Sequence, residues 1–264
     1  MRREMSDMLR VIMDGPKRGA ANMAADYAVL LSVSKNESPA TLRIYRWRPP
    51  AVTIGYFQSM RDDVRRDECE KDGIDVIRRI TGGGAVFHEH EITYSLCVPL
   101  RGRIAVVSVL ESYRLLCSPV IAALRQCGID AHYSPVNDIV AGGGKISGCA
   151  QTRRSGVLLQ HGTILLDVDF EKMFRYLNVP PEKSADGGSR ARVTSIRTLA
   201  GGRAMDEHFI RGLEERCADE FALLLDADIA RQGLSGKETE CAAEIERDVF
   251  GNERWNRERK ATFL

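Results

Sequence analysis

The chain contains the stretch Arg78-Arg79-Ile80-Thr81-Gly82-Gly83-Gly84-Ala85-Val86-Phe87-His88, in which arginines and glycines separate two apolar runs. The runs on either side, Ile74 to Ile77 and Ala85 to Phe87, are typical of strands. Consecutive glycines suit a backbone that needs positive φ or close approach to a ligand, and their N–H groups can face an anion. Guanidinium groups bind phosphate or carboxylate. A tight turn between strands is the alternative, but the arginines and His88 favour an anion-binding loop.

Two common phosphate loops are excluded for this stretch. The glycines are not followed by Gly-Lys-Ser/Thr, as in a Walker A loop. They lead into a strand-like run, whereas the dinucleotide fingerprint leads into a helix. We therefore expect a strand–loop–strand arrangement around the anion.

Composition limits the class of protein. The 264 residues carry a net charge of +1, so neither nucleic acid nor a membrane surface is an expected partner. Residues 203–264 hold 10 basic and 15 acidic residues, which indicates an acidic C-terminal region on a more basic body. Seven scattered cysteines without CxxC spacing, and no signal peptide, indicate free thiols in a reducing cytoplasm.

Strand patterns cluster between residues 40 and 166. We expect strands over 41–47 and 51–57 as a hairpin, a strand over 92–98, and two paired strands around Gly142-Gly143-Gly144 and around Ser155-Gly156. Helices are expected over 22–33, 61–71, 106–127 and 171–177, and again from residue 206 onward; residues 180–193 are expected to form a mobile loop. The pattern predicts an α+β fold, a mixed sheet flanked by helices, with one domain over 1–202 and a helical extension packed on it over 203–264.

A second group of polar residues lies on the hairpin around Gly142-Gly143-Gly144. Asn137 and Asp138 precede the turn and Lys145 follows it. A carboxylate beside a carboxamide suits Mg²⁺, and a lysine there would stabilise charge between a substrate carboxylate and a phosphate. Lys145 is also the only lysine between Lys71 and Lys172 in a chain with 30 Arg and 8 Lys. Each residue alone has an ordinary structural explanation, and only the combination indicates carboxylate activation by a nucleotide.

The motifs RRITGGGAVFH, NDI with GGGKISGCAQ, and LQHGTILLDVD occur in this order, and together they resemble the catalytic domain of lipoate-protein ligase A. The resemblance runs from about residue 9 to Asn256. It implies the biotin/lipoate ligase fold and an ATP- and Mg²⁺-dependent ligase that makes lipoyl-adenylate from lipoate. The acyl group would then pass to a lysine of a lipoyl domain, in 2-oxoacid dehydrogenase E2 subunits or the glycine-cleavage H protein.

The resemblance also implies roles for individual residues. Lys145 would contact the activated carboxyl group and Asp138 the metal. The adenylate and acyl chain would be bound by the remaining motif residues: Arg79, Thr81, Gly82, Gly83, Gly84, Ala85, His88, Asn137, Ser147, Gly148, His161 and Gly162. The chain ends near Trp255, where many single-chain ligases continue into a further domain, so a small accessory subunit is an expected partner.

Two alternatives stay open. An octanoyltransferase would move an octanoyl group from acyl carrier protein through a cysteine thioester. One type carries that cysteine where this chain has Leu158, and another carries it in an insertion that corresponds to residues 130–136, which contain no cysteine. Cys149 replaces the serine usual in ligases and is interpreted as a small buried residue. The other alternative is a non-catalytic lipoate- or biotin-binding module, against which Lys145 and Asp138 argue.

Overall fold

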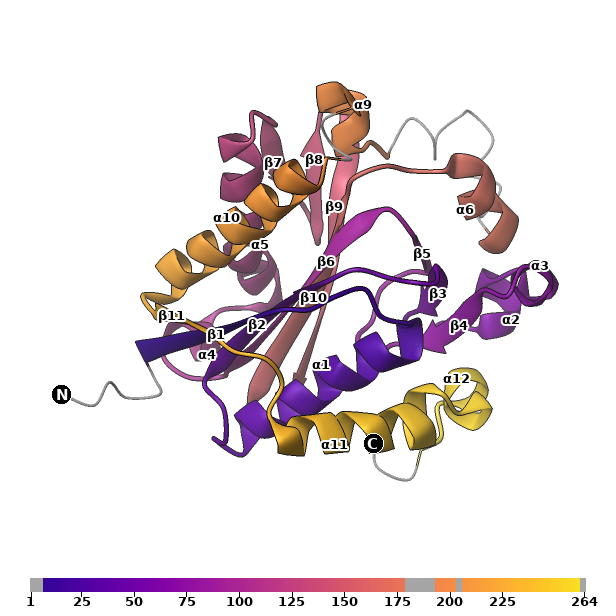
Figure 1. Cartoon of the computed structure of the whole chain (residues 1–264), viewed down its shortest axis with the longest axis horizontal. Helices are drawn as coiled ribbons and strands as arrows, with labels where there is room; N and C mark the ends of the chain where they lie inside the picture. The colour runs from indigo at the N-terminus through magenta and orange to yellow at the C-terminus, as the bar shows by residue number, and fades with distance from the viewer. Residues whose placement is uncertain (1–6, 179–192, 203–205, 262–264) are drawn as a thin grey trace.

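The computed structural model describes residues 7–178, 193–202 and 206–261. An eight-stranded mixed sheet runs through the molecule in the order β11-β1-β2-β6-β10-β9-β8-β7 (Figure 1). Its strands, in chain order, are β1 (Met8–Met13), β2 (Ala40–Tyr45), β6 (Glu91–Pro99), β7 (Ala131–Ser134), β8 (Asp138–Ala141), β9 (Gly144–Arg154), β10 (Val157–Leu165) and β11 (Asp228–Arg231). The predicted α+β class with a mixed sheet is confirmed.

A second, three-stranded sheet lies beside the first, in the order β4-β3-β5. Its strands are β3 (Ala51–Ile54), β4 (Asp75–Arg78) and β5 (Val86–His88). The expected hairpin between the strands around Thr41 and Ala51 is wrong. The chain passes Pro49-Pro50 and leaves the large sheet, so that β3 pairs with β4 and β5 and β2 pairs with β1 and β6. The sheet that carries the glycine loop is therefore separate from the sheet that carries Lys145.

Helices cover both faces of the large sheet (Figure 1). Apolar residues of α5 (Val109–Gln126) and α10 (Glu207–Leu225) pack on one face. Helices α1 (Gly19–Ser34) and α11 (Gly236–Ile245) and the π-helical turn Glu246–Phe250 pack on the other. The remaining helices are short: α2 (Met60–Asp63), α3 (Arg66–Lys71), α4 (Arg103–Val106), α6 (Phe170–Tyr176), α9 (Ile196–Ala200) and α12 (Glu253–Glu258).

Two predicted helices are each divided, for local reasons. The helix expected over 106–127 is interrupted before Ser108, because Ser108 and Glu111 form a capping box that begins α5. The helix expected over 61–71 is interrupted at Val64, whose extended backbone forms a bridge with Leu177. The loop expected over 180–193 falls outside the described residues, except for Val193.

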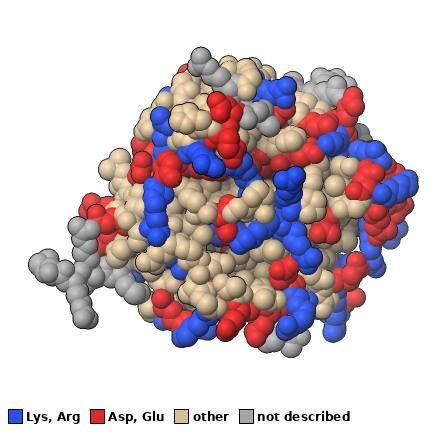
Figure 2. Space-filling model, viewed as in Figure 1, with Lys and Arg blue, Asp and Glu red and all other residues tan. Residues whose placement is uncertain are grey.

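The C-terminal region adds more than helices, because its strand β11 extends the large sheet beside β1 in parallel. A buried ion pair reinforces this edge, where the guanidinium of Arg10 donates to both carboxylate oxygens of Glu238 at 2.8 and 2.6 Å. Glu207 and Glu246 likewise pair with Arg46 and Arg18 of the body. Acidic residues of this region thus bind basic residues of the same chain, and Figure 2 shows both signs interspersed over one face.

Helix α12 anchors the residue immediately before Arg79. The indole N–H of Trp255 donates to the carbonyl of Arg78 at 2.9 Å, and the N–H of Arg78 donates to the Oδ1 of Asn256 at 2.9 Å. The Arg78 guanidinium points away from the glycine loop and donates to backbone carbonyls of Gly55, Tyr56, Gln58, Asn256 and Arg257. In the described part of the chain, no helix is long and apolar enough to cross a membrane.

Candidate active site

A cavity of about 250 Å³ lies between the two sheets and is lined mainly by apolar atoms. Ten of the fourteen site residues predicted from the motifs line it: Arg79, Gly83, Gly84, Ala85, His88, Asn137, Lys145, Gly148, His161 and Gly162. The sequence motifs therefore do converge on one cavity, although they come from different sheets.

Four predicted residues do not line the cavity, and each has another position. Thr81 is buried behind the glycine loop, and Gly82 uses its carbonyl to accept from Arg79. Ser147 is buried, and its Oγ has no hydrogen-bond partner among the described residues. Asp138 lies beside the cavity through its contact with Lys145.

The glycine loop is held by Arg79 from inside. The guanidinium donates to the carbonyls of Gly82 and Gly84 at 2.9 and 3.0 Å and to the carbonyl and Oγ1 of Thr53 at 3.1 and 2.7 Å. Burial lowers the pKa of Arg79 to about 10. Arg79 therefore shapes the loop through both terminal nitrogens, whereas the sequence predicted that it would bind a substrate anion.

Room for this loop depends on a glycine outside it. A Cβ atom on Gly55 would lie 2.0 Å from the carbonyl oxygen of Gly83, so only glycine allows this approach of two backbones. The N–H of Tyr56 donates to the carbonyl of Thr81 at 2.8 Å and fixes the same approach. Gly83 itself has φ +95°, the left-handed region that favours glycine.

A chain of polar contacts holds the His88 ring in place. Arg79 donates to Thr53 Oγ1, which lies 2.7 Å from His88 Nε2, and His88 Nδ1 lies 2.5 Å from Glu91 Oε1. Thr93 also donates to Glu91, at 2.9 Å. Both ring nitrogens of His88 thus have partners within the protein, and Trp47 stacks on this residue at 3.9 Å between ring centroids.

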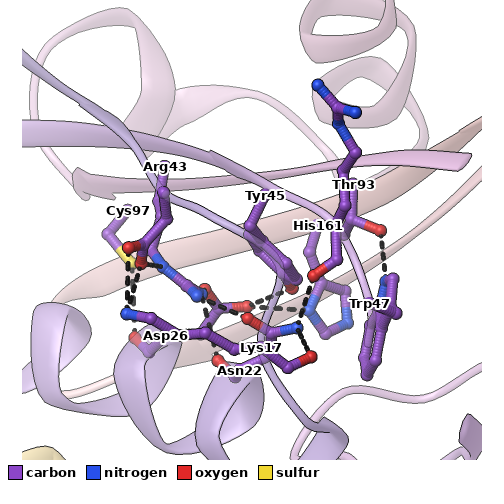
Figure 3. A network of polar contacts seen from close by, with 11 residues as sticks. Lys17, Asn22, Asp26, Arg43, Tyr45, Trp47, Thr93, Cys97 and His161 are labelled. Carbon is purple, nitrogen blue, oxygen red and sulfur yellow. Dashed lines mark hydrogen bonds and ion pairs between the residues drawn. The ribbon is translucent and has the colours of Figure 1, made fainter. Parts of the chain in front are cut away.

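A second buried network lies under His161 (Figure 3). Asp26 of α1 accepts from Arg43 at 2.7 Å and from the hydroxyl of Tyr45 at 2.9 Å, and its Oδ2 lies 3.5 Å from His161 Nδ1. Burial alone would raise the pKa of Asp26, but Arg43 and His161 outweigh it and hold that pKa below its ordinary value.

His161 connects this network to the glycine loop. Its Nε2 lies 2.7 Å from Thr81 Oγ1, so Thr81 donates to Nε2 while Nδ1–H faces Asp26. Burial lowers the pKa of His161 against the opposing effect of Asp26, so the ring is neutral at pH 7. Both ring nitrogens have partners within the protein. His161 therefore supports the glycine loop, and its ring lines the cavity without a free nitrogen.

Lys145 is the positive charge at the open end of the cavity. Its Nζ lies 2.7 Å from Asp138 Oδ1, and the two side chains are 38% and 31% exposed. Gly148 makes room for it, since a Cβ there would lie 2.6 Å from both Cε and Nζ of Lys145. The Lys145 backbone is held from the other side, where the N–H of Thr194 donates to its carbonyl at 2.9 Å. The ammonium and carboxylate therefore form a positioned, partly exposed pair, in which Asp138 Oδ1 itself is buried.

Cys149 reaches the cavity only with its backbone. Neighbouring strand residues point to opposite faces, and Cys149 pairs with Gly162 while Ala150 pairs with His161. The Cys149 thiol faces α5, where its Sγ lies 3.6 Å from Cys117 Sγ and donates to the carbonyl of Asn137 at 3.2 Å. The hydrogen bond with Cys117, together with burial, raises the pKa of Cys149. Cys149 is therefore a buried thiol, as the sequence interpretation expected.

The predicted Mg²⁺ and ATP fit these residues poorly. Asp138, the expected metal ligand, is engaged by Lys145. Arg79, expected beside the adenylate, is engaged by its own loop. Neither group enters the reaction described below.

Several site residues were missed in the sequence: Tyr45, Trp47, Thr53, Glu91 and Asp26. A signal existed for two of them. Asp26 is the only charged residue of α1, and Glu91 begins an otherwise uncharged strand. Each is a carboxylate in a segment whose composition predicts burial, and a buried carboxylate needs a polar partner. Tyr45, Trp47 and Thr53 carry no such signal, because apolar or hydroxyl residues on a strand are ordinary.

The site is thus an apolar cavity closed by a glycine loop, with a lysine–carboxylate pair beside it, on an α+β scaffold. The chain belongs to the family described as the lipoyl protein ligase A/B catalytic domain, whose model matches residues 18–222.

Relatives and solved structures differ in the activity that their names give. Octanoyltransferase LipM of Kyrpidia tusciae is 35% identical over 94% of this chain and 97% of its own length. A bipartite lipoate protein ligase from Thermoplasma acidophilum, solved in a study with its E2 lipoyl domain, superposes with a TM-score of 0.82 at 26% identity, covering 97% of this chain and 99% of that one. Lipoate-protein ligase A bound with ATP gives a TM-score of 0.80 at 27% identity, covering 94% and 98%.

The ATP-dependent ligase favoured by the motifs is contradicted by these relatives. Further octanoyltransferases LipM are 30–33% identical to this chain over 80–95% of its length. The three motifs lie within the residues that the family model matches, and the names of the relatives in this family include both ligases and octanoyltransferases. The expected accessory subunit was argued from the ligase reaction and loses its basis with it.

Proposed function

We propose that this protein is an octanoyltransferase that moves an octanoyl group from the thioester of an acyl carrier protein to a lysine of a lipoyl domain. The observation that carries the proposal is the similarity to octanoyltransferase LipM along nearly the full length of both chains. The similarity is higher than that to the ligase structures, 35% against 26–27% identity. The lipoyl domain as acceptor is supported by the family and by the E2 lipoyl domain studied with the archaeal ligase.

The site has parts suited to this transfer. The apolar cavity, with Met23, Tyr45, Trp47 and Val86 in its wall, would bury the octanoyl chain. Its carbonyl would lie at the mouth beside Lys145. When an amine attacks a thioester, negative charge develops on the carbonyl oxygen, and a fixed ammonium stabilises that charge. The networks around His88 and His161 keep the walls rigid, so little reorganisation accompanies the reaction.

The test gives the purified protein octanoyl–acyl carrier protein and an apo lipoyl domain without ATP. We expect octanoylated lipoyl domain by mass spectrometry, and Lys145→Ala should reduce its rate about 100-fold or more, the scale for losing one preorganised electrostatic group. A second reaction supplies octanoate and ATP in place of the carrier. Product only in that second reaction would contradict the proposal.

A further inference from the structure

Helix α5 has a second stripe of residues on the side that faces away from the core. Its inner side packs into the core through Leu116, Val120 and Leu124. The outer stripe recurs at steps of three and four residues, so its members share one side of the helix. Edge strand β7 packs beside α5. The stripe and the residues of this edge line a common groove, here named the α5–β7 groove, which includes Leu110, Arg114, Ile121, Arg125, Tyr133 and Pro135.

Exposed apolar side chains gather at this groove. Leu110 lines it and is 55% exposed, and its chain neighbour Val109 is 54% exposed. Val136 is 52% exposed and directly follows the lining residue Pro135. Single exposed apolar residues are ordinary on a protein surface, whereas a group of them beside a groove indicates a contact surface. The α5–β7 groove therefore has the apolar part of a protein-binding site.

The charge that is free in this groove is positive. In the described part of the chain, the guanidinium groups of Arg114 and Arg125 form no ion pair or hydrogen bond. The carboxylate of Glu111, which also lines the groove, accepts from a backbone N–H at the start of α5 at 2.9 Å. His132 lies 3.4 Å from Asp130. The two arginines are separated along the helix by about 16 Å, at 1.5 Å per residue.

The groove leads directly to the wall of the cavity. The hydroxyl of Tyr133 donates to the carbonyl of Val136 at 2.5 Å and holds the segment that follows β7. The next residue, Asn137, lines the cavity, and its side-chain amide donates to the carbonyl of Cys149 at 2.5 Å. A protein bound in the α5–β7 groove would therefore contact the segment that continues into the site.

Resting on the proposed function, we propose that the α5–β7 groove docks the acyl carrier protein through an acidic, amphipathic helix of that partner. Carboxylates about three turns apart on the partner helix pair with Arg114 and Arg125. Apolar side chains between these carboxylates cover Leu110 and Ile121, as in other complexes where a helix lies in a groove.

The donor fits this position better than the acceptor does. An acyl carrier protein holds its thioester on a flexible prosthetic arm, so the protein can dock beside the site while the octanoyl group enters the cavity. The acceptor has no such arm, and its lipoyl domain must bring its own lysine to the thioester carbonyl. We therefore assign the groove to the donor and the mouth of the cavity to the acceptor.

Charge reversal in the groove tests this assignment. The double variant Arg114→Glu/Arg125→Glu is assayed with octanoyl–acyl carrier protein and with octanoyl-pantetheine, a thioester donor without a protein. We expect kcat/KM for the carrier protein to fall about tenfold or more, because attraction is replaced by like-charge repulsion. The rate with octanoyl-pantetheine should stay within about twofold of wild type, since lysine and cavity are unchanged. Added salt should weaken the reaction with the carrier protein in the wild type more than in the variant.

The matched control is Arg101→Glu/Arg254→Glu. It changes the net charge by the same amount, at two exposed positions that line neither the groove nor the cavity. Thermal midpoints of both variants report whether the fold is kept. Calorimetry with acyl carrier protein that lacks the octanoyl group measures docking without any reaction, and we expect the Kd to rise about tenfold in the groove variant alone.

The outcomes separate this inference from the proposed function. A wild-type kcat/KM and Kd for the carrier protein in the groove variant would overturn the docking inference, and so would an equal loss in the control variant or with octanoyl-pantetheine. A higher KM for the apo lipoyl domain alone would give the groove to the acceptor and overturn it as well. If the wild-type protein makes no octanoylated lipoyl domain from either donor, the proposed function itself fails.

Discussion

Replacing Gly148 with alanine would displace the Lys145 ammonium without removing it. The new Cβ would lie 2.6 Å from both Cε and Nζ of Lys145 and 3.5 Å from Asp138 Oδ1. Ordinary contacts begin at 3.4 Å, so the end of the lysine must move by about 1 Å, and a misplacement of that size costs about 100-fold in rate. This loss corresponds to about 2.7 kcal/mol of transition-state stabilisation.

The stability of this variant should change little, because the atoms in its way belong to the flexible end of a side chain that is 38% exposed. Octanoyl transfer and the thermal midpoint are measured together for Gly148→Ala and for Gly233→Ala, whose new Cβ would meet nothing within 4 Å. Wild-type transfer by Gly148→Ala would show that the ammonium position does not set the rate. A large fall in its midpoint, beyond that of Gly233→Ala, would show that the lysine cannot move aside as argued.

Three further changes probe the supports of the cavity. Gly55→Ala places a Cβ 2.0 Å from the Gly83 carbonyl oxygen, so urea unfolding should show a loss of about 1–3 kcal/mol together with slower transfer; an unchanged midpoint would contradict the close approach. Asp26→Asn removes one carboxylate from buried Arg43 and should cost about 3 kcal/mol, the lower end of the range for breaking a buried pair because Asp14 remains 2.8 Å away. Burial lowers the pKa of His161 in the folded protein. Below about pH 6.5 the unfolded chain therefore binds a proton at this residue that the folded chain does not bind, and the free energy of unfolding decreases as the pH is lowered. The fall between pH 7 and pH 5 should be smaller in His161→Gln, and an equal fall would mean that His161 does not cause it.

Local patterns predicted the parts of the site that depend on neighbouring residues in the chain. Gly142 and Gly143 both have positive φ, and they form the turn that brings Lys145 back toward Asp138, as the glycine run indicated. Pairing between distant segments was harder. The strand at Ala51 follows a turn signal and was predicted to pair with the preceding strand, but its partners lie at Asp75 and His88, far along the chain.

For Arg79 and Cys149, the direction of the side chain determines the role, and the sequence alone does not give that direction. Arg79 lies in the motif that indicated anion binding, yet its donors are turned inward by Thr53, Gly82 and Gly84. Cys149 lies one residue from Ala150, whose partner His161 lines the cavity, and the strand period sends the thiol to the other face. The sequence shows that side chains along this strand alternate between the two faces of the sheet. It does not show which of the two faces borders the cavity.

A ribosome making this chain synthesises the glycine loop long before the residues that hold it. Arg78 precedes its anchor Trp255 by 177 residues, which at roughly 5–20 residues per second takes on the order of ten to thirty seconds. During that time β4 has its neighbour β3 but lacks the two hydrogen bonds from Trp255 and Asn256. The backbone of Arg78, directly before the glycine loop residue Arg79, therefore lacks these two partners until α12 emerges, and a chain that stops before α12 would never acquire them.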